Sequence, residues 1–108
     1  MTMVALLKTL LKMEGYEVKA LDADEDIVAA ALKEKPDVLL MDVHLVPQDG
    51  MELLIKLRAA PGGKSIRVLM TSGLDFNDQC LRRGANGFIQ KPFMPDELLK
   101  ALQKVLGP

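Results

Sequence analysis

The chain is poor in cysteine and in aromatic residues. Its 108 residues include a single cysteine, Cys80, and no tryptophan, and aromatic side chains make up 4% of the sequence. One cysteine cannot form an internal disulfide and has no partner at a metal-ligand spacing, which fits a reducing compartment. We expect Cys80 to be a helix residue that faces the core.

Long apolar runs and an excess of charge of one sign are also absent. No run approaches the ~20 residues needed to span a bilayer, and the first residues lack the basic flank of a signal peptide. The formal net charge is -1, so electrostatics give no reason to expect binding to nucleic acid or to a membrane. We therefore expect a cytoplasmic protein that selects partners by shape or local charge.

What is present is typical of one globular domain over residues 1–108, with 49% hydrophobic and 27% charged residues. Helical spacing of apolar residues and continuous apolar runs alternate along the chain. The expected order is helix Met3–Met13 after an N-cap at Thr2, strand 16–21, a helix from Asp22 or Asp24 to residue 35, strand 38–41, helix 50–60, strand 66–71, helix 76–83, strand Gly87–Gln90 and helix Pro95–Leu106.

This order predicts an α/β fold in three layers, with four parallel strands and five helices joined by right-handed crossovers. A fold of this kind normally opens with a strand, whereas this chain opens with a helix.

Three polar side chains follow three of the predicted strands. Asp42 ends the run from residue 38, Ser72 follows the strand 66–71, and Lys91 follows Gly87–Gln90. Ligands of an open parallel sheet bind outside the carboxyl ends of its strands, so these groups are expected to converge. A carboxylate beside an ammonium and a hydroxyl suits phosphoryl chemistry.

The motifs around these residues resemble the receiver domain of two-component response regulators, over nearly the whole chain. The segment from Asp42 to Gly50 is similar to the phosphoacceptor loop of that family, and Thr71-Ser72-Gly73 to its hydroxyl residue followed by a small one. Residues 84–93, with Lys91-Pro92, are similar to its last strand and the usually cis peptide bond that follows.

The resemblance implies a flavodoxin-like fold and a role in signalling rather than enzymatic turnover. Asp42 would accept a phosphoryl group from a histidine kinase or a phosphotransfer protein, Lys91 would be its charge partner, and Ser72 would move toward the phosphate. Phe88 would be the aromatic switch. Mg²⁺ would be the cofactor, held by Asp42 and the backbone carbonyl of His44.

The sequence departs from the family pattern at its start, because no counterpart of the first strand and its acidic pair precedes Thr2. The metal site is then incomplete, and we expect weak Mg²⁺ binding. Truncation, a second chain in the gap, or direct pairing of strand 16–21 with strand 38–41 would each account for this. In the last case Asp22 or Asp24 would partly replace the acidic pair. Ser72 to Gly84 is also about one helical turn short, which predicts a short helix there.

Two other functions remain open. A pseudo-receiver would bind partners without being phosphorylated. A haloacid-dehalogenase-like phosphohydrolase would also use a strand-end aspartate, a hydroxyl and a lysine, but it expects a second aspartate where this chain has His44. We expect the His44 side chain to be a solvent-exposed loop residue. The output target and the assembly, including a homodimer, are left open by the sequence.

Overall fold

The computed structural model describes residues 3–22, 24–45 and 47–107. In these residues five α-helices and one short 3₁₀ helix surround three strands. Their bounds are α1 Met3–Met13, α2 Ile27–Glu34, β1 Val38–Asp42, α3 Gly50–Ala59, η1 Gly63–Ser65, β2 Arg67–Ser72, α4 Asn77–Arg82, β3 Gly87–Gln90 and α5 Pro95–Leu106. None of the described helices is long and apolar enough to cross a membrane.

The three strands form one parallel sheet in the order β1-β2-β3. In the register of the sheet Asp42 lies beside Thr71, and Ser72 lies beside Gln90. The middle strand β2 is buried except at its first residue, because helices cover both faces of the sheet. Since all strands run the same way, their carboxyl ends meet at one edge.

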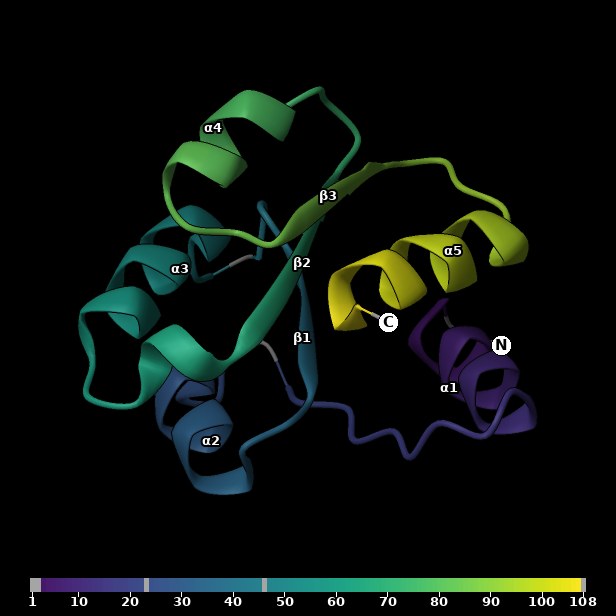
Figure 1. Cartoon of the computed structure of the whole chain (residues 1–108), viewed down its shortest axis with the longest axis horizontal. Coiled ribbons are helices and arrows are strands. Elements are labelled where there is room, and N and C mark those ends of the chain that lie inside the picture. The colour runs from purple at the N-terminus through teal and green to yellow at the C-terminus, as the bar shows by residue number, and fades with distance from the viewer. Residues whose placement is uncertain (1–2, 23, 46, 108) are drawn as a thin grey trace.

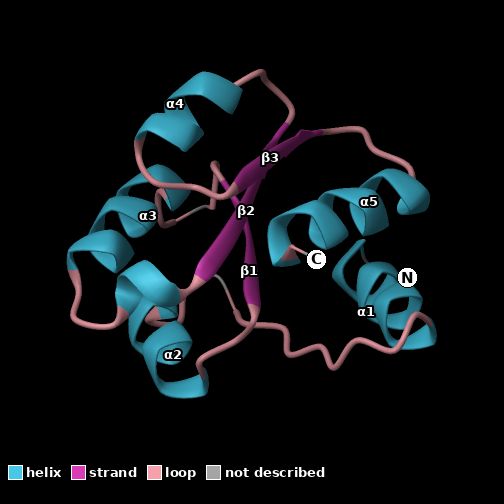
Figure 2. Cartoon of the chain, viewed as in Figure 1, coloured by secondary structure: helices cyan, strands magenta, loops and turns pink. Residues whose placement is uncertain are grey.

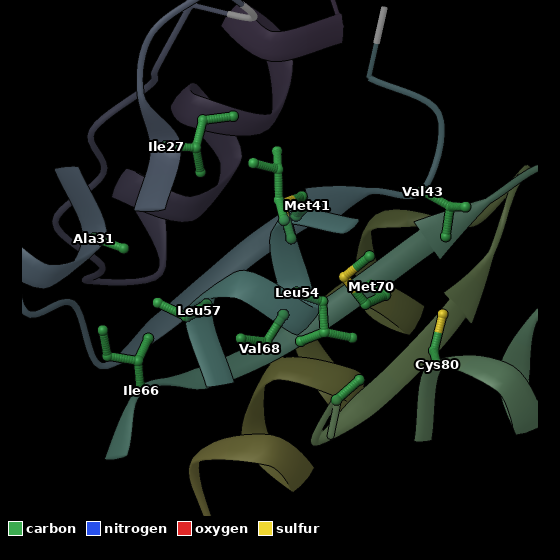
Figure 3. Packing of buried hydrophobic residues seen from close by; sticks show 12 residues of the cluster. Ile27, Ala31, Met41, Val43, Leu54, Leu57, Ile66, Val68, Met70 and Cys80 are labelled. Carbon is green, nitrogen blue, oxygen red and sulfur yellow. The ribbon is translucent and has the colours of Figure 1, made fainter. Parts of the chain in front are cut away.

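Helices cover the sheet in two layers, with α2, α3 and α4 on one face and α1 and α5 on the other (Figures 1 and 2). The first layer packs on alternate strand residues such as Met41, Val68 and Met70, and Figure 3 shows this cluster from close by. The second layer packs Leu98 of α5 against Leu69 and its neighbours. The predicted three-layer α/β fold is therefore confirmed. Cys80 is fully buried in the first layer, as expected, and burial raises the pKa of its thiol.

The predicted strand over residues 16–21 is wrong, so the sheet has three described strands rather than four. The segment still shows strand-like alternation, because Tyr16 and Val18 pack on the α1/α5 layer while Leu21 packs on the other. No described backbone hydrogen bond joins it to β1. A strand needs a hydrogen-bonded neighbour, and an alternating sequence alone does not supply one. Direct pairing with β1, one of the three explanations above, is thereby excluded.

The second helix begins later than predicted. Its N-cap is Asp26, whose side chain accepts a hydrogen bond from the Ala29 amide at 3.0 Å, so Asp22 and Asp24 are not the capping residues. The helix between β2 and β3 is short, as predicted, with six residues. The N-cap expected at Thr2 lies outside the described residues.

The start of α3 is fixed by Asp49 and Gly50. The Asp49 carboxylate caps the helix by accepting from the amides of Met51 and Glu52. Gly50 lies so close to the end of β1 that a Cβ atom there would sit 2.0 Å from the Asp42 carbonyl oxygen. The approach is held by a hydrogen bond from the Gly50 amide to the Val43 carbonyl at 2.9 Å. Only glycine fits this position.

We predict that Gly50→Ala lowers the free energy of unfolding by roughly 1 to 3 kcal/mol, because the added methyl group forces α3 away from β1. Chemical denaturation monitored by circular dichroism measures the change. Gly73→Ala is the matched control, since nothing lies within 4 Å of a Cβ atom at that position. Equal destabilisation by both variants would contradict the explanation.

Candidate functional site

Three sequence-predicted residues occupy the ends of the three strands. Asp42 is the last residue of β1, Ser72 is the last residue of β2, and Lys91 directly follows β3. The parallel register therefore brings a carboxylate, a hydroxyl and an ammonium to one edge of the sheet. The predicted placement of these three side chains agrees with the structure.

The Asp42 carboxylate is held by two contacts. Its Oδ1 accepts a hydrogen bond from the His44 amide at 2.9 Å, and its Oδ2 forms an ion pair with Lys91 Nζ. The Asp42 side chain keeps 23% of its surface exposed. A partly exposed carboxylate with a fixed orientation can be reached by a donor from solution, and the neighbouring ammonium can balance added negative charge.

Lys91 is positioned by its backbone as well as by its ion pair. Its amide donates to the Ser72 carbonyl at 2.8 Å, which links the end of β3 to the end of β2. The peptide bond between Lys91 and Pro92 is cis, as the resemblance implied. Both ends of Lys91 are thus tied to the other two residues of the site.

The Ser72 side chain is completely buried. Its Oγ accepts a hydrogen bond from the Leu74 amide at 3.2 Å, an arrangement that fixes the start of the loop after β2. This contact uses an oxygen lone pair and not the hydroxyl hydrogen. A second hydrogen bond holds the same loop: the Gln90 side chain donates to the Gly73 carbonyl at 3.3 Å.

His44 lies in the loop after β1 with an exposed side chain, as expected. Its ring meets the Phe76 ring edge-on, with centroids 5.6 Å apart. Because Phe76 comes directly before α4, this contact joins the loop after Asp42 to the loop after Ser72. This pair was not predictable from the sequence, since loop conformation decides whether two such rings meet.

Phe88 lies in β3, away from the strand ends. It is half-buried and packs on the cluster beneath α3 and α4. It also lines a depression of about 150 Å³ together with Leu81 of α4 and Val105 of α5. Phe88 therefore sits between the two helices that flank β3.

A complete Mg²⁺ site cannot be built from the described residues around Asp42. Mg²⁺ prefers octahedral oxygen ligands and usually takes one or two carboxylates. Here both oxygens of Asp42 already have partners, and the described residues contain no group of three or more histidine, cysteine or acidic side chains able to hold a metal. Asp24 lines a different depression, beside Glu25 and Gln48, and Asp42 is not part of that lining.

Thr71 is a neighbour of the site that the sequence did not single out. It lies beside Asp42 in the sheet register. Its side chain is 5% exposed, and its Oγ1 has no hydrogen-bond partner among the described residues. A buried hydroxyl without a partner costs free energy. The hydroxyl pair Thr71-Ser72 was visible in the sequence, but only the strand register shows which of the two lies beside Asp42.

Comparisons with known proteins agree with this geometry. The family model described as response regulator receiver domain matches residues 1–103. The chain is 31% identical to the chemotaxis protein CheY of Listeria monocytogenes, in an alignment of 109 positions that covers 96% of this chain and 89% of that protein. It is 33% identical to the phosphate regulon transcriptional regulatory protein PhoB of Pseudomonas aeruginosa, but spans 43% of that longer protein.

Solved structures show the same fold. A CheY-like response regulator receiver domain protein from Methanospirillum hungatei superposes with a TM-score of 0.80 and 31% identity, covering 95% of this chain and 83% of the other. The receiver domain of the sensor histidine kinase PA1611 from Pseudomonas aeruginosa superposes with a TM-score of 0.83 and 27% identity, covering 97% of this chain and 88% of the other. That structure has a magnesium ion coordinated in its active-site cleft.

We predict weak binding of Mg²⁺ by this chain. Asp42 is the one carboxylate of the site among the residues that the structure describes, and both its oxygens are already bonded. The amide NMR signals of Asp42 and His44 should therefore shift almost linearly through millimolar Mg²⁺, without saturation. Asp42→Asn serves as the control, since it should remove even this weak response. A shift that reaches a clear plateau within the titrated range would show that the site is complete.

Proposed function

The chain belongs to the response regulator receiver domain family of two-component signalling, and from that premise we propose that Asp42 accepts a phosphoryl group from a histidine kinase or a phosphotransfer protein. Residues 1–108 would act as one such domain. The observation that carries the proposal is the meeting of Asp42, Lys91 and Ser72 at the ends of three neighbouring strands.

In the proposed reaction a carboxylate oxygen of Asp42 attacks the phosphorus of a phosphorylated histidine on the donor. The new bond joins that oxygen to phosphorus, and the bond from phosphorus to the imidazole nitrogen breaks. Its electron pair stays on the imidazole, which then takes a proton from solvent. The His44 amide keeps the carboxylate oriented by holding Oδ1.

Lys91 and Ser72 have separate roles in this proposal. The Lys91 ammonium, now paired with Oδ2 of Asp42, would follow the negative charge to a phosphoryl oxygen. Ser72 would donate its hydroxyl hydrogen, which the contact with Leu74 does not use, to another phosphoryl oxygen. Both interactions stabilise charge that is present only when the phosphoryl group arrives.

The output would follow from the movement of Ser72. Because Ser72 ends β2 and its neighbour in the register, Gln90, ends β3, a shift at Ser72 is passed to the strand that carries Phe88. Phe88 lies between α4 and α5. A change in how Phe88 packs would therefore change the surface formed by those two helices, giving one arrangement for each state of Asp42. The domain would transmit a state rather than turn over a substrate, so we propose that it is not an enzyme.

The pseudo-receiver is the second candidate function, and the metal-ligand set favours it. One carboxylate, already engaged by Lys91, supports Mg²⁺ poorly, so phosphorylation would be inefficient. In that case the same fold would bind its partners without chemical modification. The phosphohydrolase has no such support, because the side chain two places after Asp42 is an imidazole that packs on Phe76.

We predict that a small phosphodonor such as acetyl phosphate, with Mg²⁺ present, adds one phosphoryl group at Asp42. Intact-mass spectrometry measures the addition, and Asp42→Asn should abolish it. Asp49→Asn is the matched control, because asparagine retains the helix-capping function of Asp49 and should leave the reaction intact. An unmodified wild-type mass would overturn the proposal in favour of the pseudo-receiver.

We predict that Ser72→Ala slows the appearance of the phosphorylated form by about tenfold or more, because one hydrogen bond to the transferring group is lost. Mass spectra taken over time give the rate. Thr71→Val is a suitable control, since it replaces a hydroxyl that has no described partner with a side chain of similar shape. A larger loss of rate in Thr71→Val than in Ser72→Ala would reverse the assignment.

A further inference from the structure

The residue at which α4 begins cannot cap the helix with its side chain. Asp26 and Asp49 accept hydrogen bonds from the first amides of α2 and α3, whereas Phe76 stands at the same position before α4 and has no acceptor in its side chain. The Phe76 carbonyl accepts the first backbone hydrogen bond of α4, from the Cys80 amide at 2.9 Å. The place where α4 starts is therefore linked to the place where the Phe76 ring packs.

The loop before α4, residues 73–76, is held mainly through side chains. Among the described residues, none of its amides donates to a backbone carbonyl. The two contacts described above fasten its first half to the ends of β2 and β3. In its second half the Asp75 carboxylate accepts from the Asn77 amide at 3.1 Å, a bond that stays within the loop and the helix. The Phe76 ring supplies the contacts that join this half to the rest of the domain.

The Phe76 ring has contacts of two kinds. It is half-buried and packs on the apolar cluster between the sheet and the α2, α3 and α4 layer. It also meets the His44 ring edge-on, at 5.6 Å between centroids and 70° between ring planes. Ring pairs prefer this geometry and attract each other beyond the area that they bury. The position of the His44 ring therefore influences the position of Phe76.

His44 is in turn oriented by Asp42. The His44 amide donates to Oδ1 of Asp42 at 2.9 Å, and an acceptor that carries charge makes this bond stronger than a neutral carbonyl would. Val43, which lies between the two residues, is buried, and its amide donates to the Thr71 carbonyl at 2.8 Å. Because the backbone before His44 is fixed in this way, a weaker bond to Oδ1 would be felt at His44 itself.

We propose that the contact between His44 and Phe76 connects Asp42 to α4, separately from the connection through Ser72 and Phe88. This inference rests on the proposed function for what changes Asp42. When Oδ2 carries a phosphoryl group, Oδ1 becomes the neutral carbonyl oxygen of the acyl phosphate. The His44 amide then loses a charged acceptor, the His44 ring shifts against Phe76, and the start of α4 follows. The His44 and Phe76 side chains are positioning groups in this scheme.

Asp42→Asn tests this connection without a phosphoryl group, because it removes the negative charge from the acceptor of the His44 amide. The amide NMR signals of residues 77–80, at the start of α4, should shift in this variant. Adding His44→Ala should reduce that shift several-fold, since alanine lacks the ring but keeps the backbone amide. His44→Phe, which restores a ring at this position, should restore most of the shift.

Variants of Phe76 test the other side of the contact. Phe76→Leu keeps an apolar side chain on the cluster but lacks the ring, so it should reduce the shift as His44→Ala does. The two substitutions together should reduce it no further than either alone, because both remove the same interaction. Phe76→Tyr should retain the shift. Leu74→Ala is the matched control, since it shortens an exposed side chain of the same loop and should leave the shift unchanged.

The amide signal of Gln90 is the internal reference, because it reports on the end of β3 rather than on α4. Its response to Asp42→Asn should be the same with and without the His44 ring, and a parallel loss would overturn the proposal. So would an equal response of residues 77–80 in the wild-type and His44→Ala backgrounds, no response in either, or a Phe76→Tyr variant that behaves like Phe76→Leu. None of these outcomes depends on whether Asp42 is phosphorylated, which the mass measurement decides separately.

Discussion

The parallel pairing of β1, β2 and β3 in a single register is the constraint on which the rest of the molecule depends. It sets Asp42 beside Thr71 and Ser72 beside Gln90, so polar groups far apart in the sequence meet at one edge. The close approach of Gly50 to the Asp42 carbonyl adds α3 to that edge. The ion pair between Lys91 and Asp42 then forms across strands that the sheet has already aligned.

The strand ends were predictable because a buried parallel strand is an uninterrupted apolar run, and a polar residue at its end is easily seen. This placed Asp42, Ser72 and Lys91 correctly. The strand prediction for residues 16–21 was wrong because their alternating pattern indicates only burial on two faces, which the structure does show. An alternating pattern does not indicate whether a neighbouring strand is present to form hydrogen bonds. Pairing depends on which segment lies alongside, and a local pattern cannot contain that information.

Loop and cap geometry was the other part that the sequence left undetermined. Asp22, Asp24 and Asp26 are all acceptable N-cap residues, and tertiary packing of α2 decides that Asp26 takes the role. The contact of His44 with Phe76, and the amide of His44 on Asp42 Oδ1, likewise depend on how two loops turn. Functional groups at strand ends were thus easier to predict than the contacts that orient them.

The opposite end of the sheet is held more firmly than the site. There Arg58 donates to the carbonyls of Gly63, Ile66 and Gly84 and to the Asn86 side chain, at 2.6 to 3.0 Å. Its burial lowers the pKa of the guanidinium, and the group stays charged because that pKa starts far above neutrality.

At the site, the loop after β2 is held by two longer contacts, the 3.2 Å bond to Ser72 Oγ and the 3.3 Å bond from Gln90. Since weaker local contacts open first, a new charge on Asp42 would displace the loop after β2 before it disturbed the end fixed by Arg58. Under the proposed function, a change of state would therefore involve the strand ends, Phe88 and the helices that follow, and would leave the end held by Arg58 in place.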